Sequence, residues 1–574
     1  MDNKVLKEYM TRFSREKLKS YLGQDILESL LEWQNDDEYI FNKCVLAELI
    51  ITINGLNILK EKNFRKDLLR TFEPEQILEL KQLLPAKYVN ITDLNELVDI
   101  ISNLSWKKTS VTERLLQILE IDIDKVFNQK EEKELAVNTI QSYEKFYELL
   151  DYQYVIRQKA LNKLMSGYEG ERMLIHMPTG TGKTKTATHI ICHHYNYNLN
   201  KRGLVIWIAH TNELLGQAYE TFENVWKHLG NGKINVFKLW GEYDIDSQIE
   251  NLDGIAFCSI QKLESIARKN TALYERLRKE ARLIVYDEAH KASAPESRKL
   301  INDLMIKTGE DRALIGLSAT PGREKRVSFD NRLLASTFGG YEIHIDTRLM
   351  NEVNYSRQKA INIKPEEDII KYFQEKGVLA KIKKLELTYE EDISQEDLEK
   401  IILQKKQNGD IDFSNKSLEI IGKNKKRNLC IIKKLRELND QKIPTIVFAC
   451  SVTHAQLLSA MLKIEGIKNS LIIGDMPSRE RAEAIKKFKD RENDVNIIIN
   501  YEVLTTGFDS TNIKCVFITR PTQSIVLYSQ MIGRGLRGPQ MGGNEECLLI
   551  DVKDNLMKYN ENMAFSHFDN YWKE

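Results

Sequence analysis

The sequence predicts an α/β protein with two tandem parallel-sheet lobes behind an all-α N-terminal domain. Residues 1–145 carry leucines and isoleucines at helical spacing, whereas short apolar runs alternate with helical segments over residues 146–345 and again over 431–574. Strand and helix in alternation are typical of parallel sheets. A charged stretch, residues 346–430, separates the two blocks and is expected to be a helical insertion or linker. A chain of 574 residues exceeds what one hydrophobic core serves, so we expect about three or four domains.

The composition indicates an ordinary soluble protein without a global charge bias. Hydrophobic residues make up 42% and charged residues 29%, and 84 basic side chains balance 84 acidic ones. Any surface that binds nucleic acid must therefore be local. The 7 cysteines are scattered without a Cys-x-x-Cys pair, which is typical of reduced thiols. We find no signal-peptide core and no apolar run near the roughly 20 residues that span a bilayer, so we expect a cytoplasmic protein without a membrane partner.

The N-terminal block contains helical periodicity but no catalytic motif. Leu18, Leu22 and Ile26 recur at helical spacing, Gly23 can end one helix, and Asp93 can cap another. No phosphate loop, metal-ligand spacing or nuclease-like carboxylate pair occurs before residue 146. The block is therefore either a scaffold that docks a partner or a domain that recognises a feature of DNA.

A phosphate-binding loop is the clearest motif of the first alternating block. The apolar run at 173–177 breaks at Pro178, passes through two glycines and opens onto a helical segment. The N–H groups of such a turn, the helix dipole and a lysine bind phosphate together, and a hydroxyl can ligate Mg²⁺. The usual pattern begins with glycine, where this chain has Met177. The predicted nucleotide-binding residues are Thr179, Gly180, Thr181, Gly182, Lys183 and Thr184, and Thr184 is also a predicted Mg²⁺ ligand.

An acidic pair at the end of a strand supplies the second part of the expected site. The candidate strands of this block are residues 173–177, 204–209, 254–258, 283–286 and 313–317. Asp287 and Glu288 follow the fourth strand, about 100 residues after the phosphate loop. In this position Asp287 can hold Mg²⁺ while Glu288 orients and deprotonates an attacking water. The alternative is that the pair merely caps a helix.

With these motifs the chain resembles the DEAH-box helicases and translocases of superfamily 2, whose motifs follow in the same order. The resemblance implies that Gln158 reads adenine and that Ser318 and Thr320 couple hydrolysis to domain movement. In the first block it implies contacts to a nucleic-acid backbone at His210, Thr211, Ser259 and Gln261. A serine or threonine after a strand is usually only a helix cap, so each of these motifs alone is weak evidence. The order of all the motifs along the chain is what is specific to the family.

The second alternating block has no phosphate loop of its own. Its candidate strands are residues 445–449, 471–473, 496–500, 515–519 and 547–551. A sheet without a nucleotide loop, following one that has it, suggests a lobe that closes over the bound nucleotide. Just before this block, the basic run 423–427 is either part of a solvated linker or part of a surface that tracks phosphates.

Two further stretches resemble the fifth and sixth motifs of the family. Gly507 would allow close backbone approach, and Asp509 would meet the ribose or the coupling network. In the sixth motif, Gln530, Arg534 and Arg537 would act on the γ-phosphate. The two arginines stand three apart on an expected helix, so both could face it, and the planar guanidinium suits phosphoryl oxygens. The resemblance also implies nucleic-acid contacts at Thr453 and Thr505.

The resemblance is closest to the motor subunits of type I and type III restriction enzymes, and it covers the chain from about residue 150 onward. It implies two RecA-like lobes, ATP and Mg²⁺ as cofactors, and DNA as a partner. Because no nuclease motif occurs, we expect a separate effector or nuclease subunit bound through the N-terminal domain, in an anti-phage or restriction-like system.

Two other hypotheses fit the same motifs. One is an ATP-driven clamp or sensor that closes on nucleic acid and recruits an effector without processive unwinding. The other is an RNA helicase, which is disfavoured because the large region that follows the sixth motif in DEAH-type RNA helicases is not found in this sequence. The aromatic-rich segment 551–574 is expected to dock against the second lobe.

Overall fold

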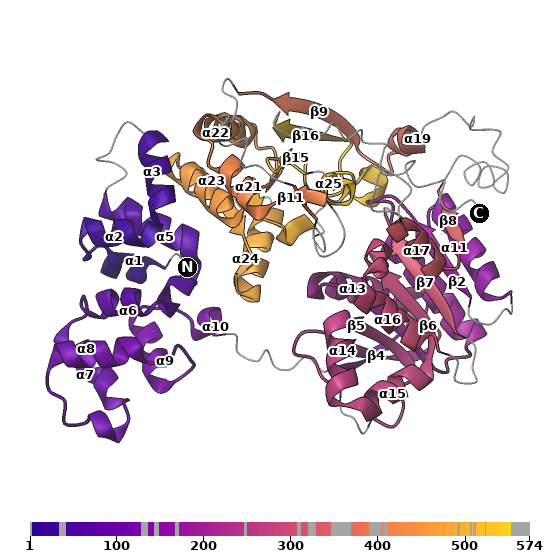
Figure 1. Cartoon of the computed structure of the whole chain (residues 1–574), viewed down its shortest axis with the longest axis horizontal. Helices are drawn as coiled ribbons and strands as arrows, with labels where there is room; N and C mark the ends of the chain where they lie inside the picture. The colour runs from indigo at the N-terminus through magenta and orange to yellow at the C-terminus, as the bar shows by residue number, and fades with distance from the viewer. Residues whose placement is uncertain are drawn as a thin grey trace.

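The computed structural model contains a helical N-terminal domain and two lobes built on separate sheets (Figure 1). It describes residues 3–33, 42–127, 136–142, 148–166, 171–245, 249–306, 312–319, 329–345, 369–389, 403–405, 411–474, 476–490, 494–505, 508, 512–522 and 524–552. The expected fold class is confirmed. Within these ranges, no helix is long and apolar enough to cross a bilayer.

Helices follow one another through the N-terminal domain. Their bounds are α1 Lys4–Met10, α2 Arg15–Leu22, α3 Gln24–Trp33, α5 Lys43–Asn54, η1 Gly55–Lys60, α6 Lys62–Leu69, α7 Pro74–Gln82, η2 Ala86–Tyr88, α8 Leu94–Asn103, α9 Ser110–Ile118 and α10 Ile123–Val126. The predicted helix end at Gly23 and helix start at Asp93 are confirmed. Gly23 ends α2 with a φ of 83°, and the Asp93 carboxylate caps α8 by accepting the Asn95 N–H at 2.7 Å.

The first lobe is an eight-stranded sheet in the order β1-β4-β5-β3-β6-β7-β2-β8. Its strands are β1 Val137–Gln141, β2 Arg172–His176, β3 Leu204–Ala209, β4 Lys233–Leu239, β5 Gly254–Ser259, β6 Ala281–Asp287, β7 Ala313–Ser318 and β8 Glu342–His344. Among the described residues, every strand pairing in this sheet is parallel except that of β1 with β4. All six residues of β3 are buried, as expected for a central strand covered on both faces.

Helices cover both faces of this sheet. They are α11 Asp151–Leu164, α12 Lys183–His193, η3 His194–Asn198, α13 Asn212–Leu229, α14 Ile260–Lys269, α15 Thr271–Glu280, η4 Ala289–Ser293, α16 Pro295–Leu304 and α17 Phe329–Thr337. The five predicted strands are present, and β1, β4 and β8 were not predicted. Since β1 belongs to this sheet, the expected domain boundary at residue 145 is too late, and the lobe begins before residue 137.

The second lobe is a six-stranded parallel sheet in the order β13-β14-β12-β15-β16-β9. Its strands are β9 Lys381–Leu387, β12 Thr445–Phe448, β13 Asn469–Ile472, β14 Ile497–Asn500, β15 Cys515–Ile518 and β16 Glu546–Val552. Its helices are α19 Ile369–Glu375, α21 Asn415–Gly422, α22 Lys425–Asp440, α23 Val452–Ile464, α24 Ser478–Lys489, η5 Val503–Thr505, α25 Ile525–Ile532 and η6 Pro539–Met541. All five predicted strands are present.

The charged stretch 346–430 is not simply a helical linker, which corrects the prediction. Its described residues supply β9 to the second sheet and a two-stranded hairpin, β10 Leu403–Lys405 with β11 Ile411–Phe413. Because β9 pairs with β16 at the edge of the sheet, most of its side chains are exposed or half-buried, and this exposure explains its polar sequence.

The N-terminal domain packs against the second lobe. In Figure 1, α3 and α5 lie beside α23, and the buried side chains of the two parts form one continuous cluster. The Gln456 side chain donates to the Ile53 carbonyl at 3.0 Å, and Lys463 lies 3.5 Å from Glu48. These contacts attach the domain to one of the two lobes, which the sequence did not indicate.

Leu457 on α23 tests this attachment, because only 4% of it is exposed in the shared cluster. We expect Leu457→Asp to cost about 2–5 kcal/mol and to loosen the N-terminal domain, since it buries an unpaired charge. Limited proteolysis should then release that domain faster than in the wild type. Leu429→Asp, at a position with 43% exposure in the same lobe, is the control. Equal cleavage rates for the two variants would contradict the shared core.

Candidate functional site

The predicted phosphate loop connects β2 to α12. Gly180 and Gly182 have φ values of 87° and 81°, a region that favours glycine. The Thr181 hydroxyl donates to the Pro178 carbonyl at 2.7 Å and closes the turn. Met177, which stands where the usual pattern has glycine, is fully buried in the lobe core. The departure from the pattern therefore leaves the loop itself intact.

Lys183 brings the phosphate loop to the acidic pair. Its Nζ lies 3.9 Å from Asp287 Oδ1 and 3.6 Å from Glu288 Oε1. The three side chains have exposed fractions of 14%, 5% and 14%. They meet because β7 alone separates β6, which ends at Asp287, from β2. The structure thus brings together the residues predicted to bind phosphate, hold a cation and activate water.

The two carboxylates differ in their proton affinity. Burial raises the pKa of Asp287 to about 6, a shift that Lys183 opposes. Burial also acts to raise the pKa of Glu288, but Lys183 and His290 outweigh it and hold that pKa below its usual range. His290 Nδ1 lies 3.2 Å from Glu288 Oε2. Glu288 is therefore kept as a carboxylate, the form that a general base requires.

The glutamine that contacts the phosphate loop is Gln153, and the role of Gln158 in reading adenine stays a prediction. Gln153 Nε2 donates to the Thr181 carbonyl at 2.8 Å, while its Oε1 accepts the Leu150 N–H at 3.0 Å. A Cβ on Gly182 would lie 2.3 Å from the same Nε2. Gln158 instead donates to the Tyr154 hydroxyl at 2.9 Å within its own helix.

The signal that the sequence interpretation missed is the position of Gln153 at the start of α11. There it caps the helix and faces the loop at the same time. Tyr152 precedes it and donates from its hydroxyl to the same Thr181 carbonyl at 2.8 Å. The first turn of α11 therefore holds the phosphate loop through two hydrogen bonds to the Thr181 carbonyl.

The second lobe packs directly onto the phosphate loop. A Cβ on Gly533, at the end of α25, would lie 2.3 Å from Thr179 Cγ2. Leu379 and Leu536 reach the position of a Gly180 Cβ at 3.4 and 3.7 Å. The main chains of the latter two segments are also joined, because the Ala380 N–H donates to the Leu536 carbonyl at 2.8 Å. The candidate site is thus formed by both lobes.

The expected helix carrying Arg534 and Arg537 is not observed, which corrects the prediction. Helix α25 ends at Ile532, and Gly535 packs so closely on Cys547 that a Cβ there would lie 2.3 Å from its Sγ. Arg537 lies in a bridge paired with Leu379. The Arg534 guanidinium donates to the Thr505 carbonyl at 2.9 Å and to the Phe508 carbonyl.

Gln530 and the fifth motif complete this part of the site. Gln530 Nε2 is buried on α25 and has no hydrogen-bond partner within the part of the chain that the structure describes. Thr505 is 8% exposed, and its hydroxyl donates to the Glu502 carbonyl at 2.5 Å. Gly507, Asp509 and Thr320 lie outside the described residues, as does the aromatic-rich segment from residue 553 onward.

The predicted nucleic-acid contacts of the first lobe follow two adjacent strands. Strands β3 and β5 pair in parallel with Ala209 opposite Ser259, so His210 and Thr211 emerge beside Ser259 and Gln261. The hydroxyls of Thr211 and Ser259 accept N–H groups of the following helices at 3.3 and 3.1 Å. Both residues are therefore helix caps in this structure, and their contact to nucleic acid stays a prediction.

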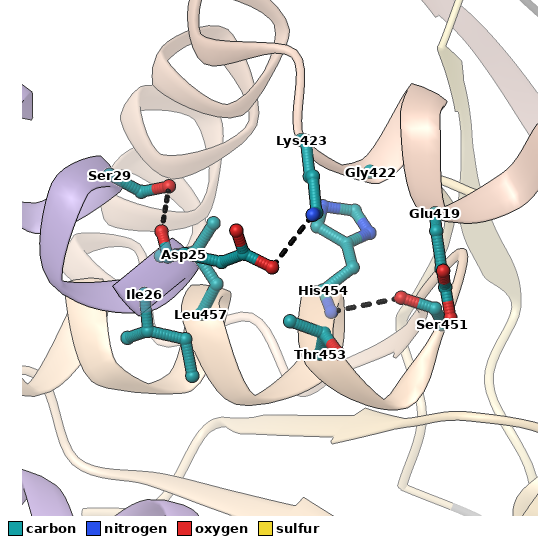
Figure 2. Close-up of a pocket in the computed structure, with 10 residues that line it drawn as sticks. All are labelled: Asp25, Ile26, Ser29, Glu419, Gly422, Lys423, Ser451, Thr453, His454 and Leu457. Atoms are coloured by element: carbon teal, nitrogen blue, oxygen red, sulfur yellow. Dashed lines mark hydrogen bonds and ion pairs between the residues drawn. The ribbon is translucent and has the colours of Figure 1, made fainter. Parts of the chain in front are cut away.

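Thr453 lines a pocket between the second lobe and helix α3 of the N-terminal domain (Figure 2). Lys423 pairs there with Asp25 at 2.7 Å. Arg427 is completely buried and donates to the Thr519 carbonyl. The basic run 423–427 is thus not a uniform surface for tracking phosphates, because one of its cations lies in the core.

His454 lies in the wall of the same pocket and is 2% exposed. Its Nδ1 accepts the Cys450 N–H at 3.1 Å, and its Nε2 faces Asn428 Oδ1 at 3.0 Å. The acceptor role of Nδ1 and the amide oxygen opposite Nε2 together specify a neutral ring protonated on Nε2. Burial, with Arg427 nearby, holds the pKa of His454 well below its usual value.

Two family descriptions match the parts of the chain that carry these motifs. Residues 146–323 match "Type III restriction enzyme, res subunit", and residues 426–538 match "Helicase conserved C-terminal domain". A Saccharomyces cerevisiae protein named as an ATP-dependent helicase, IRC3, is 28% identical over 409 residues, which cover 70% of this chain and 51% of that protein.

Two restriction-enzyme proteins are similar as well. The Escherichia coli type I restriction enzyme EcoAI endonuclease subunit is 25% identical over 431 residues, covering 72% of this chain and 47% of that protein. A solved fragment of an HsdR subunit of a type I restriction enzyme from Vibrio vulnificus is 17% identical, with a TM-score of 0.46 over 80% of this chain and 73% of the fragment. The chain spans about half the length of the curated relatives it matches.

The fold and the site define a two-lobed nucleotide-binding protein, with a phosphate loop in the first lobe and the second lobe packed across it. Together with the matched families, they support a helicase of superfamily 2 that is related to the motor subunits of restriction enzymes.

Gly533 tests the contact between the lobes. We expect Gly533→Ala to leave nucleotide binding within about twofold and to lower ATP turnover about tenfold, because the added methyl group strains the closed cleft by about 1–3 kcal/mol. Nucleotide titration and steady-state hydrolysis measure the two effects. Gly474→Ala, where a Cβ meets nothing within 4 Å, is the control. Unchanged turnover would show that this contact does not limit the reaction.

His454 predicts a dependence of stability on pH. Because its pKa is lower in the folded protein than in the unfolded chain, acid protonates the unfolded chain first. We expect the free energy of unfolding to fall as the pH drops below about 6.5, by at most about 1.4 kcal/mol per pH unit for this group. His454→Gln can keep both hydrogen bonds without titrating, so denaturant titrations at several pH values should show a shallower slope. Equal slopes would contradict the prediction.

Proposed function

We propose that this protein is an ATP-dependent DNA helicase or translocase, which couples ATP hydrolysis to movement on DNA or to its unwinding. The observation that carries the proposal is the contact of Lys183 with Asp287 and Glu288 beneath a loop that Gly533 of the other lobe touches. A nucleotide bound there would meet both lobes at once. Its hydrolysis could then open and close the cleft.

In this mechanism each residue has a distinct role. The loop from Thr179 to Gly182 and the Lys183 ammonium would bind the phosphates of ATP. Glu288, held as a carboxylate, would orient the attacking water and accept its proton. Gln530, on α25 of the second lobe, has an amide nitrogen without a hydrogen-bond partner among the described residues, and this N–H group could donate to a phosphate or to the water.

The donor set also fits Mg²⁺. Thr184 offers a hydroxyl in the first turn of α12, and Asp287 offers a buried carboxylate, whose pKa is raised mainly by that burial. These two residues would hold the ion, which would neutralise phosphate charge when bound.

Arg534 would act indirectly. It is bonded to the carbonyls of Thr505 and Phe508, so it links the end of α25 to the loop that carries a predicted nucleic-acid contact. Arg537 is the other arginine of this motif, and we propose that it acts on the phosphates. The contacts of His210, Thr211, Ser259, Gln261, Thr453 and Thr505 would reach the backbone of the nucleic acid, which makes binding largely independent of sequence.

DNA is favoured as the substrate by the match to restriction-enzyme subunits. An effector or nuclease subunit would dock on the N-terminal domain, which is attached to the second lobe and would move with it. A restriction-like or anti-phage role follows from this analogy. The alternative of an ATP-driven clamp uses the same contacts without processive movement, and strand displacement separates the two.

The test is steady-state ATP hydrolysis with no nucleic acid, single-stranded DNA, duplex DNA or RNA. We expect DNA to stimulate the wild type and Glu288→Gln to bind ATP within about twofold while hydrolysing it at least about a hundredfold more slowly, because the general base is lost. Stimulation by RNA alone would reject DNA as the substrate. An active Glu288→Gln protein would reject Glu288 as the base.

A further inference from the structure

His176 and Glu342 form a buried polar pair beside the phosphate loop. His176 ends β2, and Glu342 begins the neighbouring strand β8. The His176 Nδ1 lies 3.2 Å from Glu342 Oε1, and the two side chains are only 5% and 3% exposed. On its other side, the His176 Nε2 lies 2.8 Å from the Ala319 carbonyl oxygen. The imidazole therefore connects β8 to the residue that follows β7.

The geometry specifies where one proton lies. A carbonyl oxygen only accepts, so the Nε2 of His176 carries a proton that it donates to Ala319. The contact of Nδ1 with the carboxyl oxygen then needs a proton on one of those two atoms, because two lone pairs would repel each other. Whichever atom holds it, the Nε2 of His176 stays bonded to the Ala319 carbonyl.

Ala319 lies just beyond the last backbone pairing between β2 and β7. The Met177 N–H donates to the Ser318 carbonyl at 3.0 Å, which continues the pairing of β2 with β7. The next carbonyl along this chain, that of Ala319, is bound by the His176 side chain. Strand β7 lies between β6, which ends at the acidic pair, and β2, which precedes the phosphate loop. A shift of either neighbouring strand would therefore change the position of Ala319, which follows β7.

Stability does not account for this pair. Both carboxyl oxygens of Glu342 are buried without a hydrogen bond among the described residues, and Oε1 makes only a close polar contact with His176 Nδ1. Replacing a buried polar pair by apolar side chains of similar volume is often neutral or stabilising. A leucine at each position would fill the space without desolvating a carboxyl group, so the polar pair needs another explanation.

We propose that His176 and Glu342 are positioning residues that hold Ala319 and thereby couple ATP hydrolysis to nucleic-acid binding. This inference rests on the proposed function. The carboxyl group of Glu342 fixes the imidazole, and the imidazole fixes the first residue beyond β7. Movement of the phosphate loop would thus be transmitted to Ser318 and Ala319 at the end of β7.

The test compares nucleic-acid-stimulated with basal ATP hydrolysis in four variants. For His176→Phe and for the double variant His176→Leu/Glu342→Leu, we expect the stimulated kcat to fall about tenfold, with the basal rate and the KM for ATP within about twofold of wild type. Glu342→Gln should retain the stimulation, because its amide can donate to Nδ1. Arg172→Leu is the matched control, since it removes a 2.9 Å bond to the Thr337 carbonyl at the other end of β2.

Thermal unfolding of each variant separates coupling from stability. The inference predicts a double variant with a Tm near that of the wild type and a lost stimulation ratio. An unchanged ratio in the double variant would overturn it. A parallel loss of basal rate, stimulated rate and Tm would also overturn it, because the pair would then be structural. If wild-type protein itself shows no stimulation, the proposed function fails, and the inference fails with it.

Discussion

A lysine placed against two buried carboxylates is the interaction on which the arrangement of the first lobe depends. Lys183, Asp287 and Glu288 are each at least 86% buried as side chains, and buried charges are tolerated only when they are paired. The loop after β2 and the end of β6 must therefore meet. Strand β7 lies between them, so its end is fixed by the same requirement.

The second lobe meets this centre through very small or apolar groups. Gly533 approaches Thr179, while Leu379 and Leu536 approach Gly180. Contacts of this kind have no directional bonds to break, so they can separate and re-form when the cleft opens. The Arg534 guanidinium, by contrast, is tied to carbonyl oxygens of its own lobe and keeps that lobe rigid around α25.

The sequence predicted those elements whose chemistry is local. The phosphate loop and the acidic pair depend on short runs, and most of the ten predicted strands are short apolar segments whose side chains are largely buried. Strands β1, β4 and β9 were missed because they lie at or near sheet edges, where polar residues are tolerated, and β8 because it has three residues.

The remaining errors concern side-chain direction, which spacing alone does not determine. Gln153 and Gln158 lie on one helix, and only the first faces the loop. Arg427 sits in a basic run but points into the core. The attachment of the N-terminal domain to the second lobe depends on contacts between residues some 400 positions apart in the sequence. No local sequence pattern indicates such contacts.

That attachment also has a consequence for synthesis on the ribosome. Helix α5 is made long before its neighbour α23, and about 400 residues separate them, which takes roughly 20 to 80 seconds at elongation rates of about 5–20 residues per second. During that interval the apolar face that α5 presents to the second lobe has no native cover. Its protection until the second lobe emerges is a requirement of this fold, and chaperones are the cellular means of meeting it.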